Sequence, residues 1–357
     1  MPFLRTLLIP FSCIYGLITF LRNKFFDWGW LKSISYPFPV IAVGNLNAGG
    51  TGKTPMVEYL VELLANQGSL AVLSRGYKRK SIGFKMASDS STAIDIGDEP
   101  MQFKKKFPHL KVAVDANRNR GITALKNQFP ELSVVILDDA IQHRYVKAGF
   151  TILLTDYSKL FCNDFLLPTG SLREFPSGKK RADVIVVTKS PAAISEDEKK
   201  QIVKKIEPLP SQNVYFTHIL YGNLQPIFDK NLNCSIAKES TVLLFCGIAN
   251  PSALIQHLNS KYEDLRTLRF QDHHNFDDQD LKHIKDTFLS INSKNKIIVT
   301  TEKDAMRLKS VQLSDNIKNL PLFYIPIKTA FSVEEGMEFN QQILSYARAN
   351  KKHDGLH

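Results

Sequence analysis

The sequence predicts an α/β fold, with a parallel-sheet domain, a second and smaller α/β domain, and a helix at the N-terminus. Short apolar runs alternate with helical stretches along most of the 357 residues, which is the pattern of a parallel sheet covered on both faces. The length suits two domains, and the character of the chain changes near Pro208 and Pro210. We therefore expect an N-terminal segment over 1–28, a first domain over 29–210 and a second domain over 211–357.

The N-terminal segment contains an uncharged apolar run at residues 6–21, preceded by Arg5 and followed by Arg22 and Lys24. As a helix this run would be about 24 Å long, which is shorter than the hydrocarbon layer of a bilayer. Pro10 would disturb such a helix unless it lies in the first turn. We expect a membrane-associated, amphipathic or monotopic anchor whose basic ends meet anionic headgroups. A buried core helix is the alternative.

The expected secondary structure follows from apolar runs and helical periodicity. One face of the first expected helix carries Val57, Leu60, Val61 and Leu64, and Gly68 follows it as a stop signal. Strands are expected at residues 39–44, 70–74, 111–115, 133–138, 151–155, 184–188, 213–219, 241–247, 296–301 and 322–326. Helices are expected at residues 54–66, 251–259, 278–289 and 333–348.

Composition restricts the partners. The formal net charge is +11, which favours anionic lipid, phosphorylated substrates or nucleic acid. Aromatic and basic residues do not interleave as in single-strand binders, so we expect no nucleic-acid partner. The four cysteines form no CxxC pair, so we expect reduced thiols in a cytoplasmic protein and no zinc site.

The most specific motif is the run GGTGKT at residues 49–54, between an expected strand and an expected helix. Its glycines let backbone N–H groups point at phosphates, and the helix N-terminus adds a positive dipole end. Lys53 would neutralise β- and γ-phosphate charge, and the Thr54 hydroxyl would bind Mg²⁺. The run is predicted to be a P-loop that binds ATP through Asn47, Ala48, Gly49, Gly50, Thr51, Gly52, Lys53 and Thr54.

Two neighbouring features narrow the kind of P-loop protein. Asn47 stands where the strict motif has glycine, and we expect it to tolerate the left-handed backbone that glycine would supply there. Ala48 replaces the additional lysine of one ATPase class. The segments 188–191 and 301–304 do not match the N/T-K-x-D element of guanine readers, so ATP is favoured over GTP.

A P-loop needs an acidic metal partner, and residues 134–137 supply an apolar strand that ends in Asp138 and Asp139. The carboxyl ends of parallel strands form the ligand-binding edge of such sheets. We expect Asp138 to bind Mg²⁺, directly or through water, together with Thr54.

Further polar clusters follow the other expected strands and turns. Each alone has an ordinary structural explanation, such as a helix cap or a surface ion pair. Together they resemble, in order and over most of the chain, the tetraacyldisaccharide 4'-kinase (lipid A 4'-kinase) family. The matching residues are 43–45, 49–55, 74–77, 97–100, 138–139, 142–143, 172–174, 272–273 and 301–304. The sequence departs from the family's pattern at 140–141, Thr169, Ser171 and 246–250, which affects substrate detail more than reaction class.

The resemblance implies an enzyme of lipid A biosynthesis that transfers the γ-phosphate of ATP to the 4'-hydroxyl of a tetraacylated glucosamine disaccharide 1-phosphate. It implies a peripheral or monotopic position on the cytoplasmic face of the bacterial inner membrane. An anionic, acylated glycolipid agrees with the positive net charge and the apolar N-terminus.

The resemblance also implies catalytic roles. Asp98 would act as the base on the sugar hydroxyl, and His273 would orient it or accept the proton. With His273 on the second domain, closure would assemble the site and exclude water. If Asp98 is not the base, His274 and Glu99 are the next candidates. The metal and the phosphates would be organised by Asp139, Gln142, Arg173 and Glu174.

Two other classes stay open at this point. A P-loop kinase for a soluble metabolite would need no anchor, and a nucleotide-switched binding protein would need no catalytic base. The first predicts cytosolic behaviour of the full-length protein. The second predicts that substitutions at Asp98 and His273 leave function intact.

Overall fold

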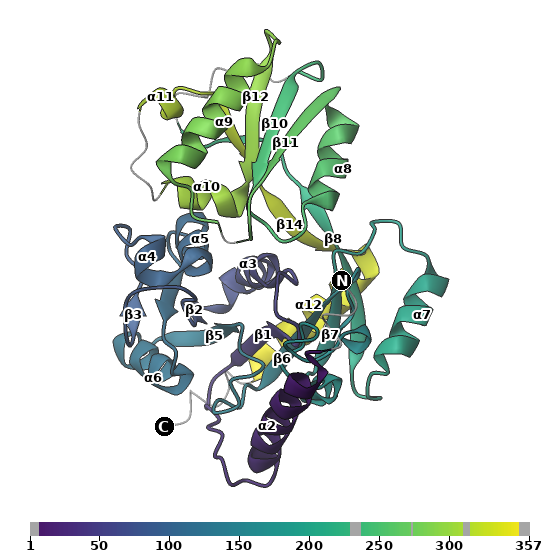
Figure 1. Ribbon diagram of the computed structural model, residues 1–357. Helices are drawn as coiled ribbons and strands as arrows, with labels where there is room; N and C mark the ends of the chain where they lie inside the picture. The colour runs from purple at the N-terminus through teal and green to yellow at the C-terminus, as the bar shows by residue number, and fades with distance from the viewer. Residues whose placement is uncertain (1–6, 229–236, 273, 310–314, 350–357) are drawn as a thin grey trace.

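The computed structural model describes residues 7–228, 237–272, 274–309 and 315–349, and it confirms the α/β class. Across these residues the strands form two sheets, one of nine strands and one of five (Figure 1). The larger sheet contains β1 (Val40–Asn45), β2 (Ser69–Ser74), β3 (Lys85–Met86), β4 (Lys111–Val114), β5 (Leu132–Asp138), β6 (Phe150–Asp156), β7 (Val184–Thr188), β8 (Asn213–Tyr221) and β14 (Ile327–Phe331).

The larger sheet has the order β14-β8-β7-β6-β1-β5-β2-β4-β3. Its strands pair in parallel except at the two edges, where β3 and β14 run antiparallel to their neighbours. Strand β1 lies between β6 and β5, and Val43 is the partner of Asp138. The register therefore brings the end of β1 beside the end of β5, which is where ligands bind in parallel sheets.

Helices cover both faces of this sheet because its strands are apolar on both sides. One core contains side chains of α3 (Lys53–Leu64), α5 (Asp98–Lys106) and α12 (Val333–Ala349). On the opposite face pack α6 (Arg118–Gln128) and α7 (Glu196–Ile206). The shorter elements are α4 (Ala93–Ile96), η1 (Ala65–Gln67), η2 (Phe161–Asn163) and η3 (Pro176–Arg181).

The smaller sheet has the order β11-β10-β12-β13-β9 and is parallel except at β9. Helices α9 and α10 pack on one face and α8 packs on the other. The elements are β9 (Gln225–Pro226), β10 (Thr241–Cys246), α8 (Ser252–Lys261), β11 (Asp264–Arg269), α9 (Asp278–Ser290), β12 (Lys296–Thr301), α10 (Glu302–Lys309), α11 (Asp315–Lys318) and β13 (Leu322–Ile325).

Sheet membership does not follow the division expected at residue 210. Strand β8 comes after that position and pairs with β7 of the larger sheet. Strand β14 then pairs with β8, and α12 buries Phe339, Ile343 and Ala347 in the core of α3. We propose a division in which the smaller unit is inserted between β8 and β14, because the hydrophobic faces of β14 and α12 are buried only against the first sheet.

The N-terminal helix α2 (Ile9–Asp27) is attached to the first unit along one side, and Pro10 lies in its first turn as required. The Tyr15 hydroxyl donates to the Arg173 carbonyl at 2.8 Å. Asn23 donates to the Glu174 carboxylate at 2.8 Å. A Cβ on Gly16 would lie 2.6 Å from the end of the Leu166 side chain, so a larger residue here would require that side chain to move. Among the described residues, we find no helix that combines the length and the hydropathy of a membrane span.

Candidate active site

The loop between β1 and α3 has the backbone that its glycines predict. Gly49 and Gly52 have φ angles of 122° and 80°, values that side chains other than glycine rarely adopt. A Cβ built on Gly49 or Gly50 would meet no atom within 4 Å. The loop therefore faces open space, and its N–H groups precede the N-terminus of α3, where phosphates bind.

The expectation that Asn47 takes a left-handed backbone is wrong. Among the described residues with positive φ outside glycine are Asp139 and Lys189, but not Asn47. Its buried side chain instead donates to the Asp164 carboxylate at 3.0 Å and to the Ser171 hydroxyl at 3.3 Å. The Ala48 N–H donates to the Ser171 carbonyl at 2.6 Å. Asn47 therefore fixes the loop through side-chain hydrogen bonds, which glycine could not make.

Lys53, the first residue of α3, turns back over the loop. Its Nζ donates to Asn45 Oδ1 at 3.0 Å and lies 3.5 Å from Asp139 Oδ1. Thr54 follows in the first turn of the helix and is half-buried. The predicted phosphate lysine and the predicted metal residue thus lie at the same helix end, next to the loop.

Asp138 ends β5 beside the loop and is 4% exposed. Burial, together with the negative charges of Asp139 and Glu99, raises the pKa of Asp138 to about 6. The Ser74 hydroxyl donates to it at 2.9 Å. A buried carboxylate that is difficult to ionise is stabilised by a cation, and oxygen donors are the ligands that Mg²⁺ prefers. Within the described residues no group of three His, Cys, Asp or Glu side chains could hold a metal.

Asp139 differs from Asp138 although the two are adjacent. Its backbone is left-handed, with φ of 51°. Burial opposes its ionisation, but the charges of Lys53 and Arg173 outweigh burial and hold the pKa of Asp139 below its usual range. One guanidinium nitrogen of Arg173 donates to both carboxylate oxygens at 3.0 Å. Asp139 is therefore an ionised carboxylate that positions two cations at the loop.

The hydrogen-bond partners of Glu174 lie outside the loop over residues 47–54. Its carboxylate is 3% exposed and accepts from Asn23 at 2.8 Å, Gln142 at 3.1 Å and Arg181 at 2.7 Å. Gln142 also donates to the Asn45 carbonyl at 2.9 Å. These bonds join α2 to the end of β1, so Glu174 supports the site through its neighbours.

Two basic residues were not identified as site residues from the sequence. Arg118 is 2% exposed and donates to the Asp138 carbonyl at 2.9 Å. Burial lowers the pKa of Arg118 to about 10, against the raising effect of Asp138 and Asp139. Lys189 donates to the Gly50 carbonyl and to Asp156. Both residues closely follow expected strands, and this position at the ligand-binding edge of the sheet is the signal in the sequence that could have identified them.

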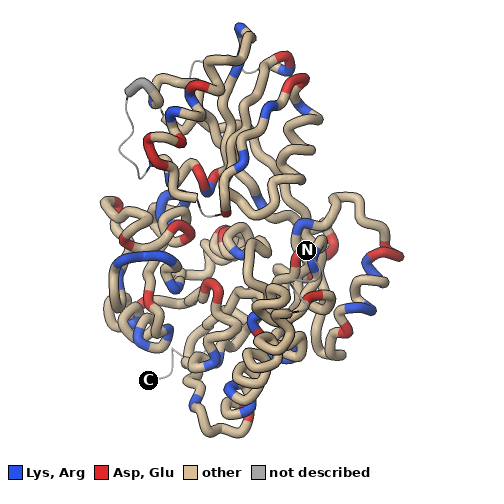
Figure 2. Tube along the Cα trace, viewed as in Figure 1, with Lys and Arg blue, Asp and Glu red and all other residues tan. Residues whose placement is uncertain are grey.

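Asp98 is the first residue of α5 and lies where the two units meet. Its Oδ2 accepts from Nε and a terminal nitrogen of Arg307 in α10, at 2.9 and 2.8 Å. The neighbouring Glu99 pairs with Lys303 at 3.0 Å and also acts electrostatically on Asp138. The beginning of α5 therefore faces both the metal edge of the first sheet and helix α10. Figure 2 shows acidic and basic segments meeting where α5 and α10 approach.

His273 lies outside the described residues. Of the described residues on either side of it, the carbonyl of Gln271 and the Cβ of His274 lie 3.0 and 3.2 Å from a Cβ built on Gly247. The Gly247 carbonyl accepts from Arg307 at 3.4 Å. His274 itself bonds Asp280 at 2.7 Å and stacks on Phe270, so this second candidate for the base is engaged at the start of α9.

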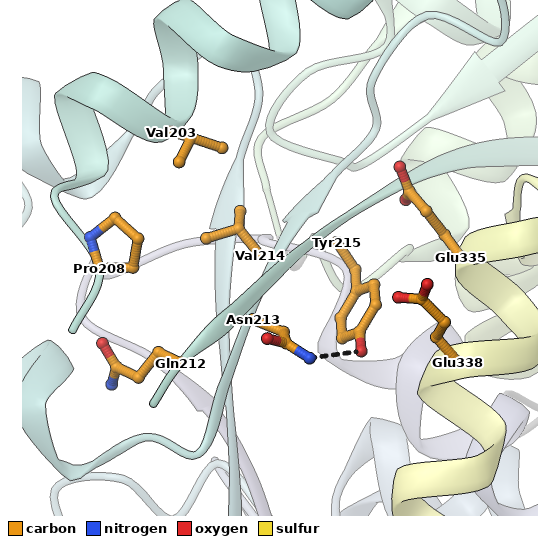
Figure 3. Close-up of a pocket in the computed structure, with 8 residues that line it drawn as sticks. All are labelled: Val203, Pro208, Gln212, Asn213, Val214, Tyr215, Glu335 and Glu338. Atoms are coloured by element: carbon orange, nitrogen blue, oxygen red, sulfur yellow. Dashed lines mark hydrogen bonds between the residues drawn. The ribbon is translucent and has the colours of Figure 1, made fainter. Parts of the chain in front are cut away.

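A surface cavity of about 310 Å³ lies elsewhere, at the opposite end of the first sheet. Its lining includes Asn213 and Tyr215 at the beginning of β8, and Glu335 and Glu338 of α12 (Figure 3). Because β7 and β8 are parallel, this is the amino edge and not the edge that carries the loop.

Comparison with known proteins gives one family. The family model described as tetraacyldisaccharide-1-P 4'-kinase (LpxK) matches residues 4–348. The tetraacyldisaccharide 4'-kinase of Flavobacterium psychrophilum is 48% identical over 98% of this chain and 99% of its own. That of Bacteroides thetaiotaomicron is 46% identical over 98% and 95%. The crystal structure of the "apo" form of LpxK from Aquifex aeolicus in complex with ATP is 30% identical, covers 95% of this chain and 99% of its own, and has a TM-score of 0.71. The chain therefore belongs to the tetraacyldisaccharide 4'-kinase family.

Proposed function

We propose that this protein transfers the γ-phosphate of ATP to the 4'-hydroxyl of a tetraacylated glucosamine disaccharide 1-phosphate, as an enzyme of lipid A biosynthesis. The observation that carries the proposal is the open glycine loop beside Asp138 in a chain that the family model matches over residues 4–348. The ATP complex of the similar Aquifex aeolicus enzyme supports ATP as the donor.

The nucleotide is held by the loop over residues 47–54, with Lys53 at the β- and γ-phosphates. Nucleotide phosphates would draw Lys53 Nζ away from Asn45, while Asp139 still holds Arg173 at the same edge. Thr54 and Asp138 would be the protein ligands for Mg²⁺. The cation would supply charge neutralisation for the phosphates and for the buried carboxylate of Asp138. A small number of protein ligands is enough for Mg²⁺, because this cation usually keeps several waters and also binds substrate phosphates.

The acceptor hydroxyl is a poor nucleophile and needs a base. Asp98 fits this role because it begins α5 near the metal edge and belongs to the family motif at residues 97–100. His273 is the proposed partner, since the flanking residues Gln271 and His274 pack on Gly247, whose carbonyl accepts from Arg307. Positioning of these groups, together with neutralisation of the phosphate charge, would supply most of the rate enhancement in phosphoryl transfer.

The glycolipid and the membrane surface meet the protein at α2. The outward side of this helix carries apolar side chains that are 40% or more exposed: Ile9, Phe11, Ile14, Leu17, Ile18, Phe20 and Leu21. Trp28 and Trp30 follow it and are more than half exposed. Most of α2 carries no charge, and its basic residues lie near its C-terminal end. An apolar face with basic and aromatic residues at one end suits the interface of an anionic membrane. We propose a peripheral or monotopic position on the cytoplasmic face of the inner membrane, with no role for nucleic acid.

A lipid-product assay tests the proposed function. The protein is incubated with ATP labelled in the γ-phosphate and with detergent-dispersed acylated disaccharide 1-phosphate, and the lipids are separated by thin-layer chromatography. We expect label in a lipid with one additional phosphate at the 4' position. Labelling of a soluble metabolite alone would indicate a soluble-substrate kinase. ATP binding with no transfer to any acceptor would indicate a nucleotide switch.

A further inference from the structure

Arg307 is the most deeply buried cation at the junction of the two units. It belongs to α10 of the smaller unit and is 3% exposed. Nε and one terminal nitrogen donate to Asp98 Oδ2, and the other terminal nitrogen donates to Asp304 Oδ1 at 2.7 Å. The guanidinium therefore bridges a carboxylate of its own helix and the first residue of α5.

The end of the bridge in the smaller unit is fixed. Asp304 is fully buried. Its Oδ2 accepts from the Gly247 N–H at 2.9 Å and from the Thr301 hydroxyl at 2.8 Å. A carboxylate held by these bonds leaves Arg307 little freedom, and the planar guanidinium then fixes the direction of its remaining donors. Asp98 is thus oriented by atoms of β12 and α10 and of Gly247, the residue that follows β10.

Further ion pairs join α5 and α10, and their order shows that the two helices run in opposite directions. Asp98 and Glu99 at the beginning of α5 pair with Arg307 and Lys303 of α10, while Lys106 at the end of α5 pairs with Glu302 at 3.2 Å. Acidic groups at a helix N-terminus and basic groups toward a C-terminus are also favoured by the helix dipoles. This arrangement fixes the register of α10 on α5, and hence which residue of the smaller unit reaches Asp98.

We propose that Arg307 is a positioning residue for Asp98, so that the candidate base is correctly oriented only when α10 is seated on α5. The inference rests on the proposed role of Asp98 as the base. Apolar side chains of similar volume would hold two helices together as well as a buried ion pair does. A guanidinium whose other carboxylate contact is already fixed adds direction, which a base needs and a docking contact does not.

The test compares Arg307→Gln with a control in the same interface. Glu302→Gln removes a different ion pair between the units, and Lys106 keeps Glu58 as its partner at 2.7 Å. Full-length protein is assayed with ATP and the acylated disaccharide, and kcat, KM and thermal unfolding are measured for each variant. We expect Arg307→Gln to lower kcat by about 10²-fold, the cost of a misplaced catalytic group, with KM for ATP little changed. Glu302→Gln should keep a kcat near that of the unchanged protein.

Two further variants make the role specific. Arg307→Lys should recover only part of kcat, because an ammonium lacks the fixed fork of donors. In an Asp98→Asn background, Arg307→Gln should cause almost no additional loss, since residues that act as one unit are not additive. If Arg307→Gln does not fold, Arg307→Lys is combined with Asp98→Asn and the same non-additivity is expected.

The outcomes separate the inference from the proposed function. An Arg307→Gln protein as active as Glu302→Gln would overturn the positioning role, as would losses from Arg307→Gln and Asp98→Asn that multiply. In both cases, a low kcat of the Asp98→Asn protein would still support Asp98 as the base. Normal turnover of Asp98→Asn would remove the base itself, and the positioning role with it.

Discussion

The two halves of the candidate site are built in different ways. The nucleotide half consists of the loop over residues 47–54 with Asp138 and Asp139. The loop follows β1, and the two aspartates lie at the end of β5, the strand that pairs with β1 in the same sheet. The acceptor half brings together Asp98 and Arg307, which are 209 positions apart and belong to different units. The first half is formed by local backbone and strand register. The second half requires two separate cores to be packed in one register.

This difference implies that nucleotide binding and base placement are separable. A parallel sheet with buried strands and covered faces holds its edge rigidly. The contact between α5 and α10 includes three ion pairs, which are more easily rearranged than an apolar core because their desolvation nearly offsets their attraction. We expect substitutions in the nucleotide half to affect ATP, and substitutions in the acceptor half to affect mainly the chemical step.

The largest expected effect is at Lys53. Lys53→Ala should lower turnover by about 10³–10⁵-fold, because it removes a preorganised positive charge from the transferred phosphoryl group. The fold should remain, since Lys53 is a half-buried residue at the site and not part of the core. Lys189→Ala, which removes a donor to the Gly50 carbonyl on the same loop, is the matched comparison and should cost less. Equal losses for the two lysines would contradict a special role of Lys53 at the phosphates.

Asp98→Ala is expected to follow. Turnover should fall by about 10²–10⁴-fold, the usual contribution of a general base, while KM for ATP changes little. His273→Ala should cost a similar factor, and the double variant should be scarcely slower than either single one. Kinetics across a Mg²⁺ series provide the check. If raised Mg²⁺ restores Asp98→Ala, Asp98 is a metal ligand and the separation of the two halves fails.

The adjacent aspartates should respond to pH with opposite sign. The pKa of Asp138 is raised from 3.8 to about 6, so the folded state binds more protons than the unfolded state between these values. This group therefore lowers the free energy of unfolding as pH rises through that window, by about 3 kcal/mol when fully ionised and without metal. Asp138→Asn should be more stable than the unchanged protein above pH 6, with the gain absent below pH 4, and should be slower.

Asp139→Asn is the control for this pH dependence. The pKa of Asp139 lies below its ordinary value, so its ionised form stabilises the folded state above that value, and this contribution is lost as pH falls. Asp139→Asn should therefore be less stable than the unchanged protein at neutral pH. Denaturant unfolding at a series of pH values, in chelator, measures both variants. Changes of the same sign at neutral pH would refute the electrostatic difference between the two residues.

The smallest effect on the chemical step is expected at the outward side of α2. Replacing Phe11, Ile14 and Ile18 by serine should weaken sedimentation with anionic vesicles, because each apolar side chain contributes about 1.5–3 kcal/mol when buried. Turnover of detergent-dispersed substrate should be unchanged. Deleting residues 1–22 is a less selective test, because it also removes the Tyr15 contact to Arg173. Unaltered sedimentation of the triple variant would show that another surface binds the membrane.

Sequence alone was sufficient for the parts that depend on neighbours in the chain. Strands such as 184–188 were predicted residue for residue, because a short run of β-branched residues buried on both faces strongly favours a strand. The P-loop was predicted because its glycines must adopt left-handed angles between a strand and a helix, and Gly49 and Gly52 do so. Asp138 followed from the rule that strand ends gather at one edge of a parallel sheet.

Tertiary structure decided what depends on distant partners. The sequence places Asp138 and Asp139 next to each other at the end of one strand, but only packing buries one beside Ser74 and turns the other toward Lys53 and Arg173. The return of β14 and α12 to the first sheet was not predicted. An amphipathic pattern indicates that one face of an element is buried, but it does not indicate which surface covers that face. The bridge from Asp304 through Arg307 to Asp98 exists only after both cores have formed. A sequence pattern specifies the local conformation of a segment, whereas long-range contacts select among the surfaces on which it could pack.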